Sequence, residues 1–104
     1  MVRKAIIEQL HIFKESINKD FPVDTMLLFG SQAWGRPRED SDVDLIIVSS
    51  RFRKQRSLDR GIGLYKYWKI DLPVDFICVS PEEFVKARKE PTLIREAVER
   101  GVVI

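Results

Sequence analysis

The sequence LLFGSQAWGRPREDSDVDLIIV, residues 27–48, has the most informative pattern of this chain. Two apolar runs flank a polar centre, and two acids, Asp42 and Asp44, open the second run. Side chains two residues apart in a strand point to the same face. If residues 42–48 form a strand, Asp42 and Asp44 project together while Val43 and Leu45 face a core. This stretch therefore predicts a pair of carboxylates at the start of a buried strand.

Two neighbouring carboxylates repel each other, which raises the pKa of one of them or destabilises the fold. A bound divalent cation removes this repulsion, and Mg²⁺ is commonly held by one or two carboxylates plus substrate phosphates. The first apolar run ends in Gly30, and Ser31 is expected to cap a short helix, so that backbone N–H groups can approach a phosphate. The sequence has no P-loop motif. The combination predicts phosphoryl or nucleotidyl transfer.

The rest of the chain predicts helices and strands in alternation. Residues 2–19 have helical spacing of apolar side chains, and residues 51–70 are mostly helical with two glycines that weaken the centre. Strands are expected at 25–30, 42–48 and 72–80, and helices at 81–90 and 91–100, the first opened by a Ser80–Glu83 capping box and the second closed by Gly101. This order predicts an α/β (α+β) fold, a small mixed β-sheet with helices packed on it.

A third carboxylate is expected beside the first two. Asp75 lies early in the strand PVDFICV, again just before an apolar run, and it would reach Asp42 and Asp44 if the two strands pair. Asp71 is the alternative, but it precedes Pro73 and is assigned to a loop. Cys78 is expected to face the core as a small hydrophobe.

Length and composition limit the function classes. A chain of 104 residues predicts one domain, 1–104, and 44% apolar with 33% charged residues predicts a soluble globular protein. No apolar run spans a membrane and the N-terminus lacks a signal-peptide pattern, so a cytoplasmic protein is expected. The net charge of +2 does not predict nucleic-acid binding.

Two local features have alternative interpretations. The basic cluster at residues 51–56 is either a solvated helix start or a surface that contacts a triphosphate, a nucleic acid or an acidic partner. The apolar end at residues 102–104 is either an added edge strand or a docking surface.

The motifs resemble those of a known superfamily. Gly30-Ser31, ten further residues, the Asp-x-Asp of Asp42 and Asp44, and a later strand aspartate in VDFI are similar to the signature of the DNA polymerase β-like nucleotidyltransferases. The chain resembles in particular the minimal nucleotidyltransferases, small stand-alone proteins that keep the catalytic core. The motif match covers residues 27–79. Family members often have a basic residue where this chain has Trp34. Either Arg36 is expected to take over the phosphate contact, or Trp34 is expected to stack on a base or pack in the core.

The resemblance implies a reaction and a partner. It implies that Asp42, Asp44 and Asp75 hold two Mg²⁺ ions, that Gly30 and Ser31 hold the phosphates of ATP, and that AMP is transferred to a hydroxyl with release of pyrophosphate. Proteins of this type are similar to the antitoxins of toxin–antitoxin pairs, whose partners are HEPN-domain toxins that receive AMP. A homo-oligomer is left open.

Two other functions remain open at this stage. The chain could be a non-catalytic binding module that neutralises a toxin by contact. It could also be a small-molecule nucleotidyltransferase, for example one that modifies an antibiotic hydroxyl, although the acceptor-binding domain of such enzymes is not expected in this sequence.

Overall fold

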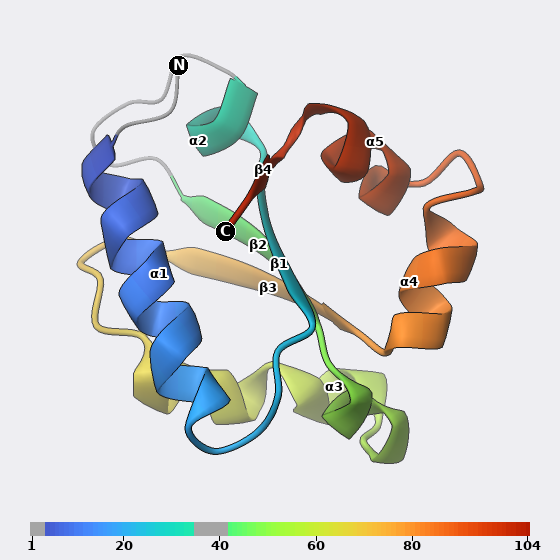
Figure 1. The fold of residues 1–104 in the computed structure, drawn as a ribbon, viewed down its shortest axis with the longest axis horizontal. Helices are drawn as coiled ribbons and strands as arrows, with labels where there is room; N and C mark the ends of the chain where they lie inside the picture. The colour runs from blue at the N-terminus through green and yellow to red at the C-terminus, as the bar shows by residue number, and fades with distance from the viewer. Residues whose placement is uncertain (1–3, 35–41) are drawn as a thin grey trace.

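The computed structural model describes residues 4–34 and 42–104. In this part of the chain the strands form a sheet of order β3-β2-β1-β4 (Figure 1). The strands are β1 (Thr25–Phe29), β2 (Val43–Val48), β3 (Val74–Val79) and β4 (Val102–Val103). The helices are α1 (Lys4–Asn18), α2 (Ser31–Trp34), α3 (Ser57–Arg60), α4 (Pro81–Ala87) and α5 (Leu93–Arg100), with 3₁₀ helices η1 (Ser50–Lys54) and η2 (Ile62–Tyr67). The predicted mixed sheet with packed helices is confirmed.

Strand pairing is mixed in direction. β1 pairs antiparallel with β2 and with β4, whereas β2 and β3 run parallel. The long connection between β2 and β3 provides the crossover that parallel strands require. The end of β1 and the starts of β2 and β3 therefore meet at one end of the sheet.

Each face of the sheet is covered by helices, as Figure 1 shows. On one face, the buried side of α1 packs with alternate residues of the strands and with Phe52 and Leu64 from the two 3₁₀ helices. On the other face, α4 and α5 contribute Phe84, Ile94 and Ala97. The central strands are apolar on both faces because both faces are covered.

The helix ends follow the predicted caps with one adjustment. Ser80 and Glu83 form the predicted capping box and Pro81 begins α4. α5 begins two residues after Pro91, at Leu93, because the Thr92 side chain accepts a hydrogen bond from the backbone N–H of Arg95. The helix predicted from Pro91 onward therefore starts later than expected.

The segment predicted as helical over residues 51–70 is broken into three short pieces, η1, α3 and η2. Arg60 explains much of this arrangement because it is buried, with 9% of its surface exposed. Its Nε donates to the Gln55 carbonyl at 3.1 Å, and its Nη1 donates to the Cys78 carbonyl at 3.2 Å and to Glu83 at 2.7 Å. These bonds fasten the segment to β3 and to the capping box of α4.

The C-terminal residues add an edge strand, one of the two predicted alternatives. β4 pairs with Leu27 and Leu28 of β1. Gly101 allows this return because a Cβ atom on it would be 2.7 Å from the Leu28 carbonyl oxygen and would overlap the Ala97 carbonyl oxygen. No helix within the described residues is long and apolar enough to cross a membrane.

Candidate active site

The three predicted acids gather where β2 and β3 begin. Asp44 lies on β2 opposite Phe29 of β1 and in register with Asp75 of β3. Because residues paired in register share a face of the sheet, the Asp44 and Asp75 side chains point to the same side, that of α4 and α5. Asp42 immediately precedes β2 and is exposed. The strand pairing that was required to bring Asp75 beside the Asp-x-Asp pair is therefore present.

Gly30 lies next to the Asp44 carboxylate. It follows the last residue of β1 and has φ +74°, a left-handed conformation that glycine adopts without strain. A Cβ atom at this position would overlap Oδ2 of Asp44 and would lie 3.2 Å from its Cγ. The sequence predicted Gly30 as a phosphate contact, and the structure adds that Gly30 makes room for the Asp44 carboxylate.

The environment of Asp44 favours its neutral form. Burial raises the pKa of Asp44 above its ordinary value, and the charges of Asp75 and then Asp42 raise it further. No described residue forms an ion pair or a side-chain hydrogen bond with any of the three acids. A half-buried carboxylate between two like charges is a site that a hard cation would stabilise.

The carboxylates are near one another without being arranged as a metal cage. Within residues 4–34 and 42–104, no three His, Cys, Asp or Glu side chains form a group that could hold a metal ion as they stand. The donor set nevertheless fits Mg²⁺ or Mn²⁺, since it consists of carboxylate oxygens with no competing soft ligand. Asp42 and Asp75 are exposed, so their side chains can turn toward a cation without disturbing the core.

The structure describes only some of the residues that were predicted to bind phosphate. The short helix α2 begins at Ser31 itself. The Gly30 carbonyl accepts a hydrogen bond from the Ala33 N–H at 3.0 Å and starts this turn. The side chains of Ser31 and Trp34, and the whole of Arg36, lie outside the described structure.

Asp71, the alternative third acid, is placed away from the strand. It lies in a bend three residues before β3, whereas Asp75 is the second residue of that strand. The register between β2 and β3 pairs Asp44 with Asp75. The preference for Asp75 over Asp71 is therefore supported by the geometry.

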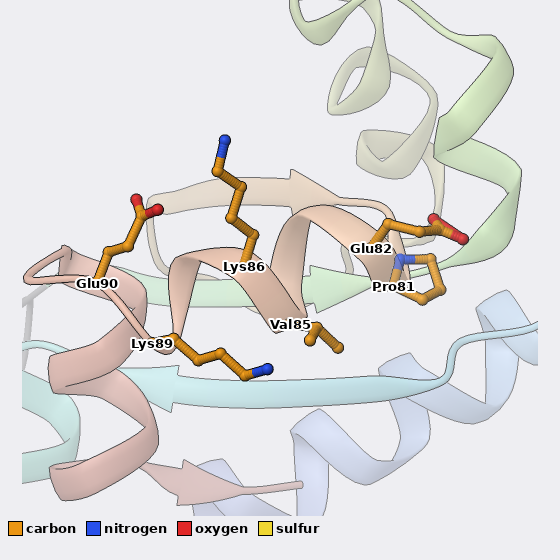
Figure 2. Close-up of a pocket in the computed structure, with 6 residues that line it drawn as sticks. All are labelled: Pro81, Glu82, Val85, Lys86, Lys89 and Glu90. Carbon is orange, nitrogen blue, oxygen red and sulfur yellow. The ribbon is translucent and has the colours of Figure 1, made fainter.

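Two sizeable surface depressions lie away from the acids. One of about 580 Å³ runs along α4 and the turn that follows it, and is lined by Val85, Lys86 and Lys89 with Pro81, Glu82 and Glu90 (Figure 2). In Figure 2 the charged ends of Lys86 and Glu90 extend from one side of the helical segment, whereas Val85 and Lys89 lie on its other side. This depression contains none of the three acids, and its apolar lining has no convergent polar groups. We therefore place the candidate site at the acids.

Comparison with known proteins agrees with this geometry. Residues 10–104 match the family model described as a nucleotidyltransferase domain. A solved structure of a Sulfolobus solfataricus protein, assigned as a nucleotidyltransferase and determined at 1.40 Å resolution, has a TM-score of 0.60 and 22% sequence identity. The similarity covers 99% of this chain and 87% of that one. No curated protein sequence matches this chain.

The described residues form a small mixed sheet with acids at the start of two parallel strands, next to a glycine turn. The family match covers nearly the whole chain, and the chain belongs to the nucleotidyltransferase domain family. The Sulfolobus structure supports the fold alone, because its sequence identity is low.

Proposed function

We propose that this protein is a Mg²⁺-dependent enzyme that transfers AMP from ATP to a hydroxyl group of a partner protein. The observation that carries the proposal is the register of Asp44 with Asp75 across β2 and β3, with Asp42 next to them. The family membership supports nucleotidyl transfer in general. The choice of ATP as the nucleotide, Mg²⁺ as the metal and a protein as the acceptor is part of the proposal and goes beyond the family membership.

In this proposal Asp42, Asp44 and Asp75 hold two Mg²⁺ ions. When bound, such ions neutralise the charge of the triphosphate and lower the barrier to attack at phosphorus. Binding also removes the repulsion that raises the pKa of Asp44. Gly30 allows close approach of the backbone to phosphate, and Ser31 and Arg36 are proposed to complete the phosphate contacts.

Asp75 is proposed to have a second role. It is exposed at the start of β3 and has no ion-pair partner among the described residues, so an acceptor hydroxyl can reach it. Asp75 would accept the hydroxyl proton as the oxygen forms a bond to the α-phosphorus of ATP. The bond from that phosphorus to the β-phosphate oxygen breaks, and pyrophosphate leaves.

The acceptor is proposed to be a HEPN-type toxin, with this protein as its antitoxin in a cytoplasmic pair. The support for this part is the resemblance of the motifs to those of minimal nucleotidyltransferases. The competing proposal is a binding module that neutralises the toxin by contact. One observation favours it: the acids of the described residues are not preformed as a metal-binding group.

One experiment separates these two functions. The chain is mixed with a HEPN-domain partner, Mg²⁺ and ATP labelled at the α-phosphate, and label on the partner is measured together with toxin activity. The proposal predicts that the wild type labels the partner and neutralises its toxin activity. Asp42→Asn should lose both the labelling and the neutralisation. Neutralisation by an Asp42→Asn/Asp44→Asn double variant, with no labelling by the wild type, would instead establish the binding module.

A further inference from the structure

A small polar pocket lies near the opposite end of β2 from the acids. Its volume is about 70 Å³, and three cationic side chains line it, Arg51, Arg60 and Lys66. Among the described residues, no carboxylate lines this pocket. The segment 51–69 that forms most of its wall has seven Lys or Arg and a single Asp, a net charge of +6, against +2 for the whole chain.

Arg60 lines the pocket, and hydrogen bonds hold its guanidinium in place. Three of its hydrogen bonds use Nε and Nη1, and the partners are Gln55, Cys78 and Glu83. Nη2 donates to no described residue, yet no described side-chain nitrogen or oxygen is both buried and without a partner. Nη2 is therefore accessible, and the pocket is the hollow that Arg60 lines. The remaining N–H groups of a held guanidinium are good donors to an oxyanion.

Arg51 and Lys66 form the rim from two different elements, η1 and η2. The Arg51 guanidinium lies 4.6 Å from the Phe21 ring centroid and the Lys66 ammonium 5.0 Å from that of Tyr67. Neither forms an ion pair with a described residue.

Two acids that contact residues of the pocket, Glu83 and Asp20, have defined partners. Glu83 binds Arg60 from the side of α4 and also caps that helix, while Asp20 accepts the hydrogen bond of the Tyr67 hydroxyl. Both carboxylates therefore have partners of their own, and Arg51 and Lys66 remain available to an anion.

A larger pocket adjoins the small one. It has a volume of about 620 Å³ and shares Phe21, Arg51 and Gln55 with it. Its exposed surface is mainly apolar, with Phe21 and Pro22 on one side. The small pocket has room for a tetrahedral oxyanion and excludes a nucleoside, whereas the larger one has room for an organic group.

We infer that this protein has a second ligand site, in which Arg60, Arg51 and Lys66 bind the phosphoryl group of a small phosphate compound. The site is distinct from the acids, since the five residue steps from Asp44 to Ser49 span about 16 Å of extended chain. The inference is independent of the proposed AMP transfer. Inorganic phosphate and an organic phosphate that also fills the larger pocket share the chemistry that these cations recognise.

The test uses the full chain in EDTA without divalent cation, so that its outcome does not depend on the acids. Inorganic phosphate and AMP are titrated at constant ionic strength, and binding is followed by NMR at the Arg60 Nε–H and at the backbone amides of 51–67. We expect saturable shifts with phosphate or AMP and none with chloride or adenosine. Tighter binding of AMP than of phosphate supports an organic phosphate, and equal binding supports inorganic phosphate.

The variants compare equal charge changes at two places. Arg51→Gln/Lys66→Gln removes the exposed rim and leaves buried Arg60 in position, so the fold should be retained. Lys69→Gln/Lys89→Gln removes two exposed charges outside the pocket. We expect at least a tenfold loss of affinity in the first variant and less than a twofold change in the second. An equal loss in both, shifts that do not saturate, or preferential binding of a single-stranded oligonucleotide would overturn the inference.

Discussion

The Asp44 carboxylate occupies the space that a side chain on Gly30 would need. The two residues come from β2 and from the end of β1, which pair antiparallel and bring Phe29 opposite Asp44. The glycine therefore makes room for an acid of the proposed metal site and adjoins the proposed phosphate site. This relationship explains why a glycine turn and an Asp-x-Asp pair occur together in one stretch of sequence.

Gly30→Ala should damage both stability and activity. Forcing alanine to φ +74° costs about 1–2 kcal/mol, and the added methyl group displaces Asp44 as well. We expect a loss of about 2 kcal/mol in the free energy of unfolding, measured by urea denaturation, and loss of transfer activity. Gly63→Ala is the control, since a Cβ atom there meets nothing within 4 Å, and it should be neutral or slightly stabilising. Equal effects of the two changes would refute the argument.

Mg²⁺ should stabilise the wild-type chain through the acids. A ligand that binds only the folded state, present at a concentration ten times its Kd, raises the free energy of unfolding by about 1.4 kcal/mol. This raises the Tm of a domain of this size by several degrees. Thermal unfolding with MgCl₂, against NaCl of equal ionic strength, should show this rise in the wild type. Asp44→Asn should show no rise. A rise of the same size in the variant would place the cation elsewhere.

Glu83 should contribute more to stability than its neighbour Glu82. Glu83 accepts hydrogen bonds from the Ser80 backbone and from buried Arg60, whereas Glu82 pairs with exposed Arg53. Glu83→Gln should lower the free energy of unfolding by about 1 kcal/mol, a modest value because the Glu83 side chain is half exposed and screened by water. Glu82→Gln should shift the midpoint of urea unfolding by less than half of the shift that Glu83→Gln causes.

The effect of Glu83 should depend on pH. Its hydrogen bonds to the Ser80 backbone, and then Arg60, hold the pKa of Glu83 below its usual 4.5 in the folded state. A carboxyl whose pKa is lowered by folding stabilises the fold above its unfolded pKa and loses this contribution as the pH falls through the folded value. The difference between wild type and Glu83→Gln should be full above pH 4.5 and should shrink below it. A difference that grows in acid would contradict this assignment.

Cys78 should be unreactive in the folded protein. Burial raises its pKa to about 12, while the charge of Arg60 acts in the opposite direction. The thiolate is the reactive species, so at pH 8 the native thiol should react with a disulfide reagent about a thousandfold more slowly than in denaturant. Similar rates in the two conditions would show that β3 opens readily at its free edge.

The sequence pattern predicts the placement of the acids better than the structure of the segment between β2 and β3. Alternation of acids and apolar residues is a local signal, and it located Asp44 and Asp75 on one face of two strands. Pairing direction is not local, and nothing in the sequence distinguished the antiparallel partner of β2 from the parallel one. The breaks within residues 51–70 depend on hydrogen bonds from Arg60 to Cys78 and Glu83, 18 and 23 residues away. Such contacts leave no periodic pattern, and the small pocket above Arg60 was therefore not predicted.

The most direct test of the account compares two aspartates on either side of Pro73. Asp75 lies in register with Asp44, whereas Asp71 lies in the bend before β3. Transfer of labelled AMP should be measured for Asp75→Asn and Asp71→Asn, with circular dichroism to establish that both fold. The account predicts at least a hundredfold loss of rate for Asp75→Asn and less than a twofold change for Asp71→Asn. Full activity of Asp75→Asn, or equal loss in both variants, would contradict it.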